Sequence, residues 1–296
     1  MNENPLGSGR ITAKLFTDPS CPFGYSANPA LRTIEWRYRD QLDWQLVMIG
    51  LSEPDGTPMP YTRTELAQSW ISLRDSHGMP FSVEPKLRPY TSSRACQAII
   101  AARLIQPGSE WRTLRALQLL HFNSPLMIDD DEQLRAALSS VEGLDADRIV
   151  SSLDSREVQD AYRRDWAEAR TAAGGPTELQ GKSADTPDGV RYTAPSVIFE
   201  SGSAGLELGG FQPVEAYDVA IANLDPTLVR SSPADSPLDA LMLYPSGLTS
   251  QEIAAIMAPH NTDADRSATE RELIGLLGER KVTRIPMGHD AVWLAA

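Results

Sequence analysis

A cysteine within residues 17–25 (TDPSCPFGY) is the residue of this chain best placed to do chemistry. An apolar, strand-like run at residues 11–16 leads into the turn that contains Cys21, and a helical pattern follows at residues 27–38. This order places Cys21 at or just before a helix N-terminus, where unpaired backbone N–H groups and the helix dipole favour a thiolate over a thiol. We therefore expect Cys21 to act as a nucleophile.

The residue three positions after Cys21 limits that chemistry. A redox Cys-x-x-Cys motif would have its second sulfur at position 24, and this sequence has Gly24 there. The segment therefore predicts chemistry with one thiol, or none. The alternative is that Cys21 is a small buried hydrophobic residue, as most free cysteines are. Phe23 and Tyr25 either cover the sulfur or belong to the core.

Two other residues have a functional and a purely structural interpretation. Pro195 begins an apolar strand, where a proline costs no hydrogen bond of the sheet. A cis bond between Ala194 and Pro195 would instead expose the backbone of residue 194 to a bound partner, but cis is the minority form of such bonds. Cys96 lies in a helical pattern and suits core packing better than the role of a remote resolving thiol.

Metal and nucleotide motifs are absent from the sequence. The four histidines show no metal-ligand spacing with each other or with cysteine. There is no Walker loop, Rossmann glycine fingerprint or G-x-S-x-G elbow. The acidic run at residues 129–132 suits the first turn of a helix better than a cation site. We therefore expect no bound metal or nucleotide.

The elements that would position Cys21 follow an α/β pattern. Residues 11–50 indicate strand, turn, helix and strand, which predicts a parallel pair joined by a right-handed crossover. Residues 62–173 are almost entirely helical, and residues 174–189 form a polar loop. Strand patterns return at residues 195–199 and 206–208 and precede a helix at 213–223. The helices expected in the helical block are residues 65–75, 91–105, 110–122, 131–139 and 155–172.

The last part of the chain has a separate pattern. Residues 226–237 are rich in proline and serine and indicate a linker. Three helices and a two-stranded hairpin then predict a winged helix-turn-helix-like domain at residues 238–296, with helices at 238–243, 250–257 and 264–278 and strands at 282–286 and 291–295. This segment has five basic and eight acidic residues, which disfavours DNA binding and favours protein docking or self-association.

The bulk properties narrow the class of protein. The net charge of −13 over 296 residues argues against binding nucleic acid or an anionic membrane surface. No apolar run approaches the roughly 20 residues that cross a bilayer, and the first ten residues lack the apolar region of a secretory signal. With only two cysteines and no disulfide framework, we expect a cytoplasmic protein.

Three short motifs and one long insertion carry a family resemblance. The Asp-Pro-Ser-Cys-Pro-Phe turn, the long helical insertion, the Ala-Pro-Ser-Val-Ile-Phe strand and the Gly-Gly-Phe-Gln-Pro ending resemble the DsbA-like thioredoxin superfamily. Its cytoplasmic branches, the FrnE-like proteins and the relatives of 2-hydroxychromene-2-carboxylate isomerase, are the most similar. The resemblance covers roughly residues 10–225, with the helical insertion at about 62–173. It implies a thioredoxin-like fold, to which the winged-helix-like domain is an addition.

The resemblance also implies roles for individual residues. Cys21 matches the attacking cysteine, and Pro195 matches the cis-proline that faces it. Ala194 would then contact the substrate through its backbone. The residues after the nucleophile, Pro22, Phe23, Gly24 and Tyr25, would line the same site. Gly24 departs from the redox members, which have cysteine there, and this departure argues against dithiol oxidation.

Three functions follow as hypotheses. The leading one is a thiol-based oxidoreductase in which Cys21 forms a mixed disulfide with a protein thiol or with glutathione or mycothiol, and a second thiol resolves it. The second is a transferase or isomerase that depends on glutathione or mycothiol and binds an organic substrate under the helical insertion. The third is a non-catalytic adaptor or regulator with a protein-binding winged helix, which an ordinary thiol pKa at Cys21 would favour.

Overall fold

A four-stranded sheet organises the first two thirds of the chain. The computed structural model describes residues 11–54 and 61–296. The strands lie in the order β2 (Leu42–Met48), β1 (Ile11–Thr17), β5 (Ser196–Ser201), β6 (Ala204–Gly209). Strands β1 and β2 are parallel, whereas β5 is antiparallel to both β1 and β6. The predicted parallel pair and the predicted hairpin are both confirmed.

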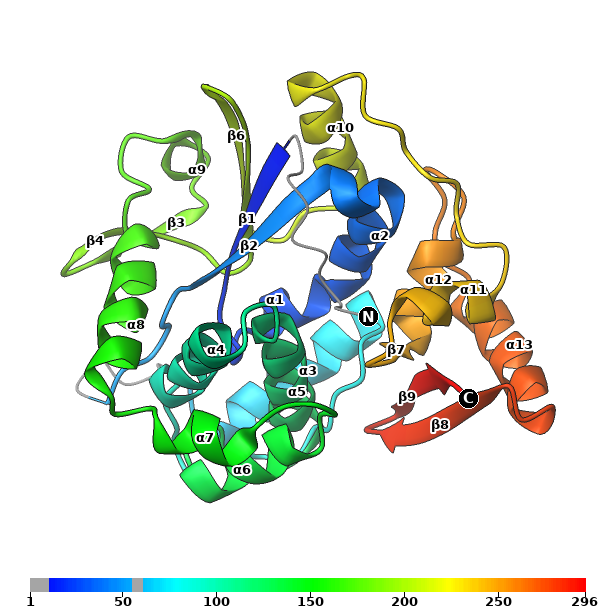
Figure 1. Ribbon diagram of the computed structural model, residues 1–296, viewed down its shortest axis with the longest axis horizontal. Helices are drawn as coiled ribbons and strands as arrows, with labels where there is room; N and C mark the ends of the chain where they lie inside the picture. Colours follow the sequence, from blue (N-terminus) through cyan, green and yellow to red (C-terminus); the bar gives the residue numbers. More distant parts are fainter. Residues whose placement is uncertain (1–10, 55–60) are drawn as a thin grey trace.

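Helices cover both faces of this sheet (Figure 1). Helices α2 (Asn28–Tyr38) and α10 (Val214–Leu224) cover one face, and a short 3-10 turn, η1 (Arg39–Gln41), joins α2 to β2. Alternate residues of β1 point to this face and enter the main core, because successive side chains of a strand point to opposite sides. The opposite face packs against the end of α8 (Arg156–Glu168) through a smaller apolar cluster.

A helical block is inserted between β2 and β5. It contains α3 (Arg63–His77), α4 (Ser93–Ile105), α5 (Glu110–Asn123), α6 (Asp131–Ser139) and α7 (Ala146–Ser151), and α8 returns the chain to the sheet. The five predicted helices are present within a few residues of their expected bounds. Helix α7 was not among them, although its N-cap, Asp145, has the side chain expected at such a position.

The polar loop predicted at residues 174–189 is wrong. The segment forms a short helix, α9 (Pro176–Leu179), and the hairpin of β3 (Ser183–Thr186) and β4 (Gly189–Tyr192). Most residues of this two-stranded ribbon are half-buried and mainly polar, so it lacks the apolar alternation by which a strand is recognised. Gly189 has φ +127° and adopts a backbone conformation that other residues rarely reach.

The C-terminal residues form a compact unit of three helices and a three-stranded sheet. Its elements are α11 (Pro237–Leu243), β7 (Leu248–Thr249), α12 (Ser250–Met257), α13 (Arg266–Gly278), β8 (Val282–Met287) and β9 (Asp290–Ala295). The strand order is β7–β9–β8. The predicted helices and hairpin are present, and the two-residue strand β7 is additional. Among the described residues, no helix is long and apolar enough to span a membrane.

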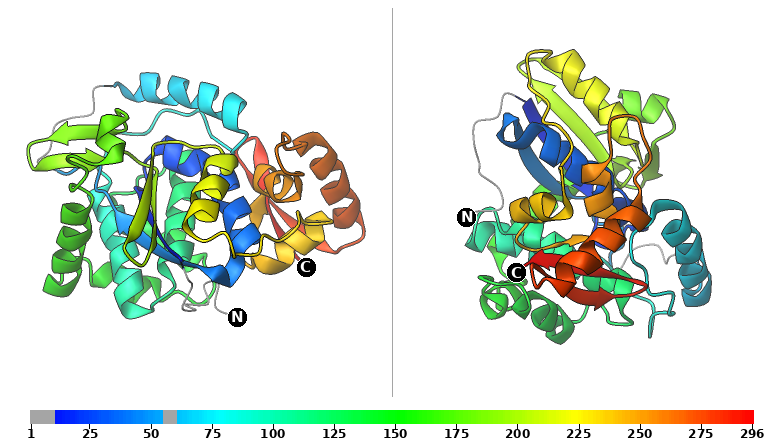
Figure 2. Two further views of the ribbon diagram at one scale, coloured as in Figure 1. Left: turned by 90° about the horizontal axis from the view of Figure 1, so that it is seen from above. Right: turned by 90° about the vertical axis from the view of Figure 1, so that its right-hand side faces the viewer.

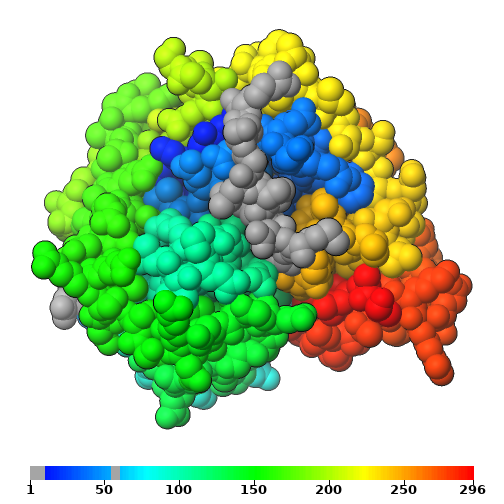
Figure 3. All heavy atoms as spheres, viewed as in Figure 1, coloured from blue at the N-terminus to red at the C-terminus, as the bar shows by residue number. Residues whose placement is uncertain are grey.

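The C-terminal unit packs against α2 on the side away from the sheet (Figures 2 and 3). Trp36 of α2 belongs to the apolar core of this unit, and its Nε1 donates to the Ser232 carbonyl at 2.8 Å. The preceding segment also contacts α2, because Ser231 N donates to the Arg37 carbonyl at 2.8 Å. The segment predicted as a linker therefore lies along the first part of the molecule.

A buried ion pair joins α12 to α5. The Glu252 side chain is fully buried, and its two oxygens accept from Arg115 Nη1 at 2.7 Å and Nη2 at 2.8 Å. Arg32 Nε of α2 lies 3.9 Å from the same carboxylate. Burial opposes the charge on Glu252, but the two arginines outweigh it and lower the pKa of the carboxyl. The charges therefore stabilise one another only while α12 is docked.

We expect Glu252→Gln to destabilise the protein by about 3–5 kcal/mol, because it leaves Arg115 buried without its counter-charge. The free energy of unfolding in urea measures this. Glu279→Gln is the matched control, since Glu279 pairs with Lys281 at the surface and should change stability by less than about 1 kcal/mol. Equal effects of the two substitutions would contradict the prediction.

Candidate functional site

Cys21 lies where β1 ends and the first helical turn begins. It is the N-cap of α1 (Pro22–Ser26), and its Sγ accepts a hydrogen bond from Gly24 N at 3.4 Å. Its own N–H donates to the Asp18 carbonyl at 3.0 Å and closes the turn that precedes the helix. The helix begins at Pro22, earlier than the sequence indicated, because a proline suits the first position of a helix.

The cis-proline turn forms the opposite wall of the site. The bond between Ala194 and Pro195 is cis, as the family resemblance implies. Cys21 Sγ donates to the Ala194 carbonyl at 3.1 Å. Strand β5 begins directly after Pro195 and pairs with β1, so the sheet itself brings positions 21 and 194 together.

The thiolate expected at Cys21 is wrong for the protein without a bound partner. Cys21 is 5% exposed, and burial raises the pKa of its thiol to about 12. The negative charge of Asp18 raises the pKa further, whereas the N–H groups of Gly24 and Phe23 and the charge of Arg191 lower it. Removal of the sulfur from water therefore outweighs the start of a five-residue helix.

The two aromatic residues after Cys21 have different environments. Phe23 is 48% exposed and lies next to the sulfur in sequence. Tyr25 is 1% exposed, packs with Phe81 and Phe122, and donates from its hydroxyl to the Pro80 carbonyl at 3.0 Å. Tyr25 is therefore a core residue rather than a substrate contact, and Phe23 is the aromatic that a partner can reach.

Gly24 is close-packed where a second thiol would begin. A Cβ placed on Gly24 would lie 2.7 Å from Thr17 Oγ1 and 3.8 Å from Cys21 Sγ. The first distance is too short for a carbon–oxygen contact, so Thr17 occupies part of the space that a side chain at position 24 needs. A side chain at position 24 would therefore require the Thr17 side chain to move.

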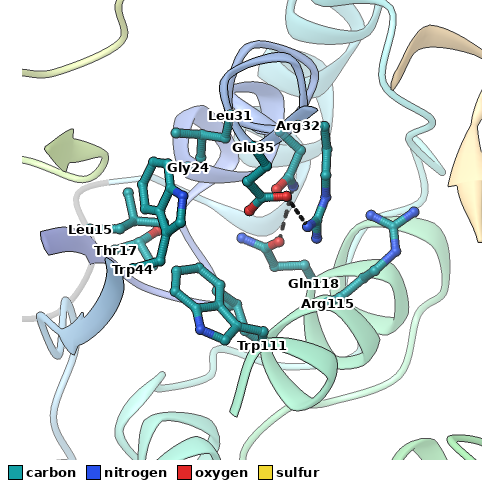
Figure 4. A pocket seen from close by; sticks show the side chains of 12 residues that line it. Leu15, Thr17, Gly24, Leu31, Arg32, Glu35, Trp44, Trp111, Arg115 and Gln118 are labelled. Carbon is teal, nitrogen blue, oxygen red and sulfur yellow. Dashed lines mark hydrogen bonds and ion pairs between the residues drawn. The ribbon is translucent and has the colours of Figure 1, made fainter. Parts of the chain in front are cut away.

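A narrow cavity of about 10 Å³ lies behind Gly24, between α2 and α5 (Figure 4). Thr17 and Gly24 line it near the site, and Arg32, Arg115 and Gln118 line it toward the C-terminal unit. It has room for about one water molecule. Arg32 and Arg115, which interact with Glu252 of the C-terminal unit, therefore also line the cavity behind Gly24.

Asp18 and Arg191 belong to the site and were missed by the sequence reasoning. Asp18 is fully buried three residues before Cys21, and Arg191 lies on β4 close enough to influence both Asp18 and Cys21. The position of Asp18 before a proline in the turn was a usable signal, because aspartate often accepts hydrogen bonds from the backbone two residues on. Arg191 gave none, since it lies between the predicted loop at residues 174–189 and the predicted strand at 195–199.

A polar groove of about 1190 Å³ lies beside the site, between α3, α4 and the segment that precedes α4. Ser52, Tyr90 and Ser93 line it and adjoin the residues around Asp18, whereas Cys21 does not line it. Within the described part of the chain, the Gln97 and Asp129 side chains in this groove each have one acceptor oxygen without a partner.

The described residues contain no group of three or more histidine, cysteine or acidic side chains that could hold a metal ion.

Cys96 is fully buried in α4, as its helical pattern predicted. The acidic run at residues 129–132 caps α6, and Asp131 pairs with Arg94 at 2.7 Å. His121 is buried, and its Nε2 lies 3.1 Å from the Tyr90 hydroxyl.

We expect Cys21 to alkylate slowly at neutral pH and faster as pH rises toward about 12, because burial raises its pKa to about 12. Iodoacetamide labelling read by mass spectrometry measures both cysteines separately. Cys96 should remain unlabelled in the folded protein, and both should titrate near the ordinary 8.5 in urea. A Cys21 midpoint below about 7.5 in the folded protein would contradict the buried-thiol description.

We expect Gly24→Ala to cost about 1–3 kcal/mol, because the added Cβ overlaps Thr17 Oγ1. The double variant with Thr17→Ala should lose less than the sum of the single variants, and urea unfolding of all three gives the coupling. Gly275→Ala in α13 is the control, since its Cβ would meet nothing within 4 Å. Additive costs at positions 17 and 24 would show that they do not compete for space.

Comparison with known proteins agrees with this geometry. The family model described as a DSBA-like thioredoxin domain matches residues 12–184. The ClpXP adapter protein SpxH of Shouchella clausii (strain KSM-K16) is 24% identical over 286 residues, which cover 94% of this chain and 86% of that protein.

Two solved structures share the thioredoxin-like fold. A candidate protein disulfide isomerase from Nitrosomonas europaea superposes with a TM-score of 0.57 at 19% identity and covers 72% of this chain and 96% of its own. The cytosolic disulfide reductase DsbM from Pseudomonas aeruginosa superposes with a TM-score of 0.51 at 17% identity and covers 72% and 99%. Together with the family match over more than half of its length, this shows that the chain belongs to the DsbA-like thioredoxin domain family.

Proposed function

We propose that this protein is a one-cysteine thiol–disulfide exchange protein in which Cys21 forms a mixed disulfide with a partner. The observation that carries the proposal is the contact of Cys21 Sγ with the Ala194 carbonyl at 3.1 Å, beside the cis-proline. This contact places Cys21 Sγ, the only sulfur among residues 21–24, next to the backbone of Ala194. An extended partner chain could pair with that backbone. No second sulfur follows it, because position 24 is glycine and Thr17 fills the adjacent space.

The exchange needs no oxidant other than the partner's own disulfide. The Cys21 thiol loses its proton to solvent, and the resulting thiolate attacks one sulfur of the disulfide. A new Cys21–partner S–S bond forms, the old S–S bond breaks, and the leaving thiolate takes up a proton. A second thiol, such as glutathione, mycothiol or a cysteine of the partner, then attacks the mixed disulfide and returns Cys21 to the thiol. The low-molecular-weight thiol is thus a co-substrate rather than a bound cofactor.

Docking would activate the thiol. A partner strand whose N–H donates to the Ala194 carbonyl competes for the acceptor that the Cys21 S–H uses. The sulfur then loses the partner of its protonated form and keeps the Gly24 N–H, which favours the thiolate. The exposed ring of Phe23 offers the docked chain an apolar contact. The thiol is in this way held inert in the cytoplasm until a partner is bound.

The finer assignments follow the same proposal. We place the chain in the cytoplasmic branch of the family that includes the FrnE-like proteins, with a catalytic domain at residues 10–225 and a winged-helix-like domain at 238–296. The excess of acidic over basic residues at positions 238–296 and the docking of α12 on α2 favour a protein-contact role for this unit over nucleic-acid binding. A thiol-dependent isomerase that uses the groove beside α4 is an alternative within the same fold.

A non-catalytic adapter is the second candidate function. Two observations favour it: the raised pKa of Cys21, and the similarity over 94% of the chain to a protein described as a ClpXP adapter. An adapter needs the recognition surface around Ala194 but not the nucleophile. Binding of purified ClpX, measured by calorimetry and unchanged by Cys21→Ser, would support this candidate, and no measurable binding would remove it.

We expect Cys21→Ser to abolish mixed-disulfide formation and Cys96→Ser to leave it intact, because Cys96 is fully buried. The probe is an extended peptide whose cysteine carries a 2-nitro-5-thiobenzoate group, and release of the coloured thiolate gives the rate. The peptide should react faster than glutathione that carries the same 2-nitro-5-thiobenzoate group, because its longer extended backbone offers more contacts beside Ala194. An equal rate for wild type and Cys21→Ser would contradict the proposed function.

A further inference from the structure

The deepest polar group near Cys21 is the carboxylate of Asp18, which accepts five hydrogen bonds. Its Oδ1 accepts from Ser20 N at 2.8 Å and from Ser20 Oγ at 2.7 Å. Its Oδ2 accepts from Leu51 N at 2.8 Å, from Ser92 Oγ at 2.7 Å and from Cys96 Sγ at 3.5 Å. Asp18 is fully buried, so these donors replace the water that a carboxylate normally binds.

The five donors come from three separate parts of the fold. Ser20 belongs to the turn before Cys21, Leu51 follows β2, and Ser92 and Cys96 belong to the start of α4. Ser92 is the N-cap of α4, yet its side chain makes no capping hydrogen bond and donates to Asp18 instead. The start of the helical insertion is thus attached to the turn that carries the nucleophile.

We propose that Asp18 is a positioning residue for Cys21, which fixes the nucleophile's turn to the helical insertion and places a buried negative charge beside the sulfur. This role matters for catalysis only if the proposed exchange function is right, but the test below measures it without that function. Burial is the largest cause of the raised pKa of Cys21, and the negative charge of Asp18 adds to it, because a neighbouring negative charge disfavours the thiolate. The opposing cation is Arg191 of β4.

Several other titratable groups surround Asp18 and Cys21. They are Cys96 of α4, Glu53 after β2, Tyr90 before α4, Tyr162 of α8 and Arg191 of β4. Of these, Arg191 and Tyr90 also interact with Cys21, whereas Glu53 interacts with Cys96. Glu53 is therefore a suitable control: a second partly buried carboxyl next to the same network that does not act on Cys21.

The test is the pH profile of Cys21 alkylation by iodoacetamide in Asp18→Asn, Glu53→Gln and Ser92→Ala. Asparagine keeps the size of aspartate and removes the charge. The Cys21 midpoint should fall by about one pH unit, so the rate at a pH below the midpoint should rise about ten-fold. Glu53→Gln should leave the midpoint in place, and Ser92→Ala, which retains the charge, should not lower it. A merely structural role of Asp18 would change rates without moving the midpoint.

An unchanged midpoint in folded Asp18→Asn, or equal shifts in Asp18→Asn and Glu53→Gln, would overturn the proposal. If Asp18→Asn does not fold, the wild-type chain still tests it. The ¹³C resonance of the Asp18 carboxyl should move as Cys21 titrates and should not move over that range in Cys21→Ser. An Asp18 resonance that does not shift while Cys21 titrates would overturn the proposal. The measurement uses no disulfide substrate, so a failure of the proposed exchange activity would be seen separately.

Discussion

Helix α2 packs in two cores at once, and the rest of the structure depends on this constraint. Leu31, Ile34 and Tyr38 face the sheet and belong to the main core. Trp36 faces the other way and belongs to the core of the C-terminal unit. The chain that enters this helix carries Cys21 and α1, so the position of the sulfur is fixed by packing on both sides of α2. Loss of either core would release the helix that follows the nucleophile.

The buried charges of this protein act as connections between segments rather than as isolated pairs. Glu252 joins α12 to α5 and α2 through two arginines, and Asp18 joins the turn before Cys21 to α4. Each carboxylate is fully buried and accepts several hydrogen bonds, which offsets the loss of water. Arginine supplies the balancing charge for Glu252, whereas Asp18 is stabilised mainly by hydrogen bonds from uncharged donors. The second site therefore leaves a negative charge to act on a neighbouring thiol.

Two sets of neighbours compete to determine whether Cys21 is a thiol or a thiolate. A helix start offers N–H groups to a thiolate, and the Ala194 carbonyl offers an acceptor to a thiol. Burial and Asp18 decide in favour of the thiol in the free protein. A bound partner that takes the carbonyl changes that balance. The exchange function depends on this change in the state of the sulfur, whereas an adapter function does not require the Cys21 thiolate.

The sequence by itself determined the α/β core, the helical insertion and the candidate nucleophile. These features follow from local patterns: apolar strands, helix periodicity, and a cysteine between a strand and a helix. The half-buried hairpin of β3 and β4 was missed because its mainly polar residues show no apolar alternation. The family resemblance supplied the cis geometry at Pro195, which the residues alone left open.

Only the tertiary structure decided the state of the sulfur and the placement of the C-terminal unit. The thiolate favoured by local order was overturned by burial and by Asp18, whose partners are up to 78 positions away in sequence. The obstruction by Thr17 at position 24 and the docking of Glu252 on Arg115 likewise join residues from separate elements. A pKa, a steric overlap and an ion pair depend on distances through space, and sequence spacing does not contain those distances.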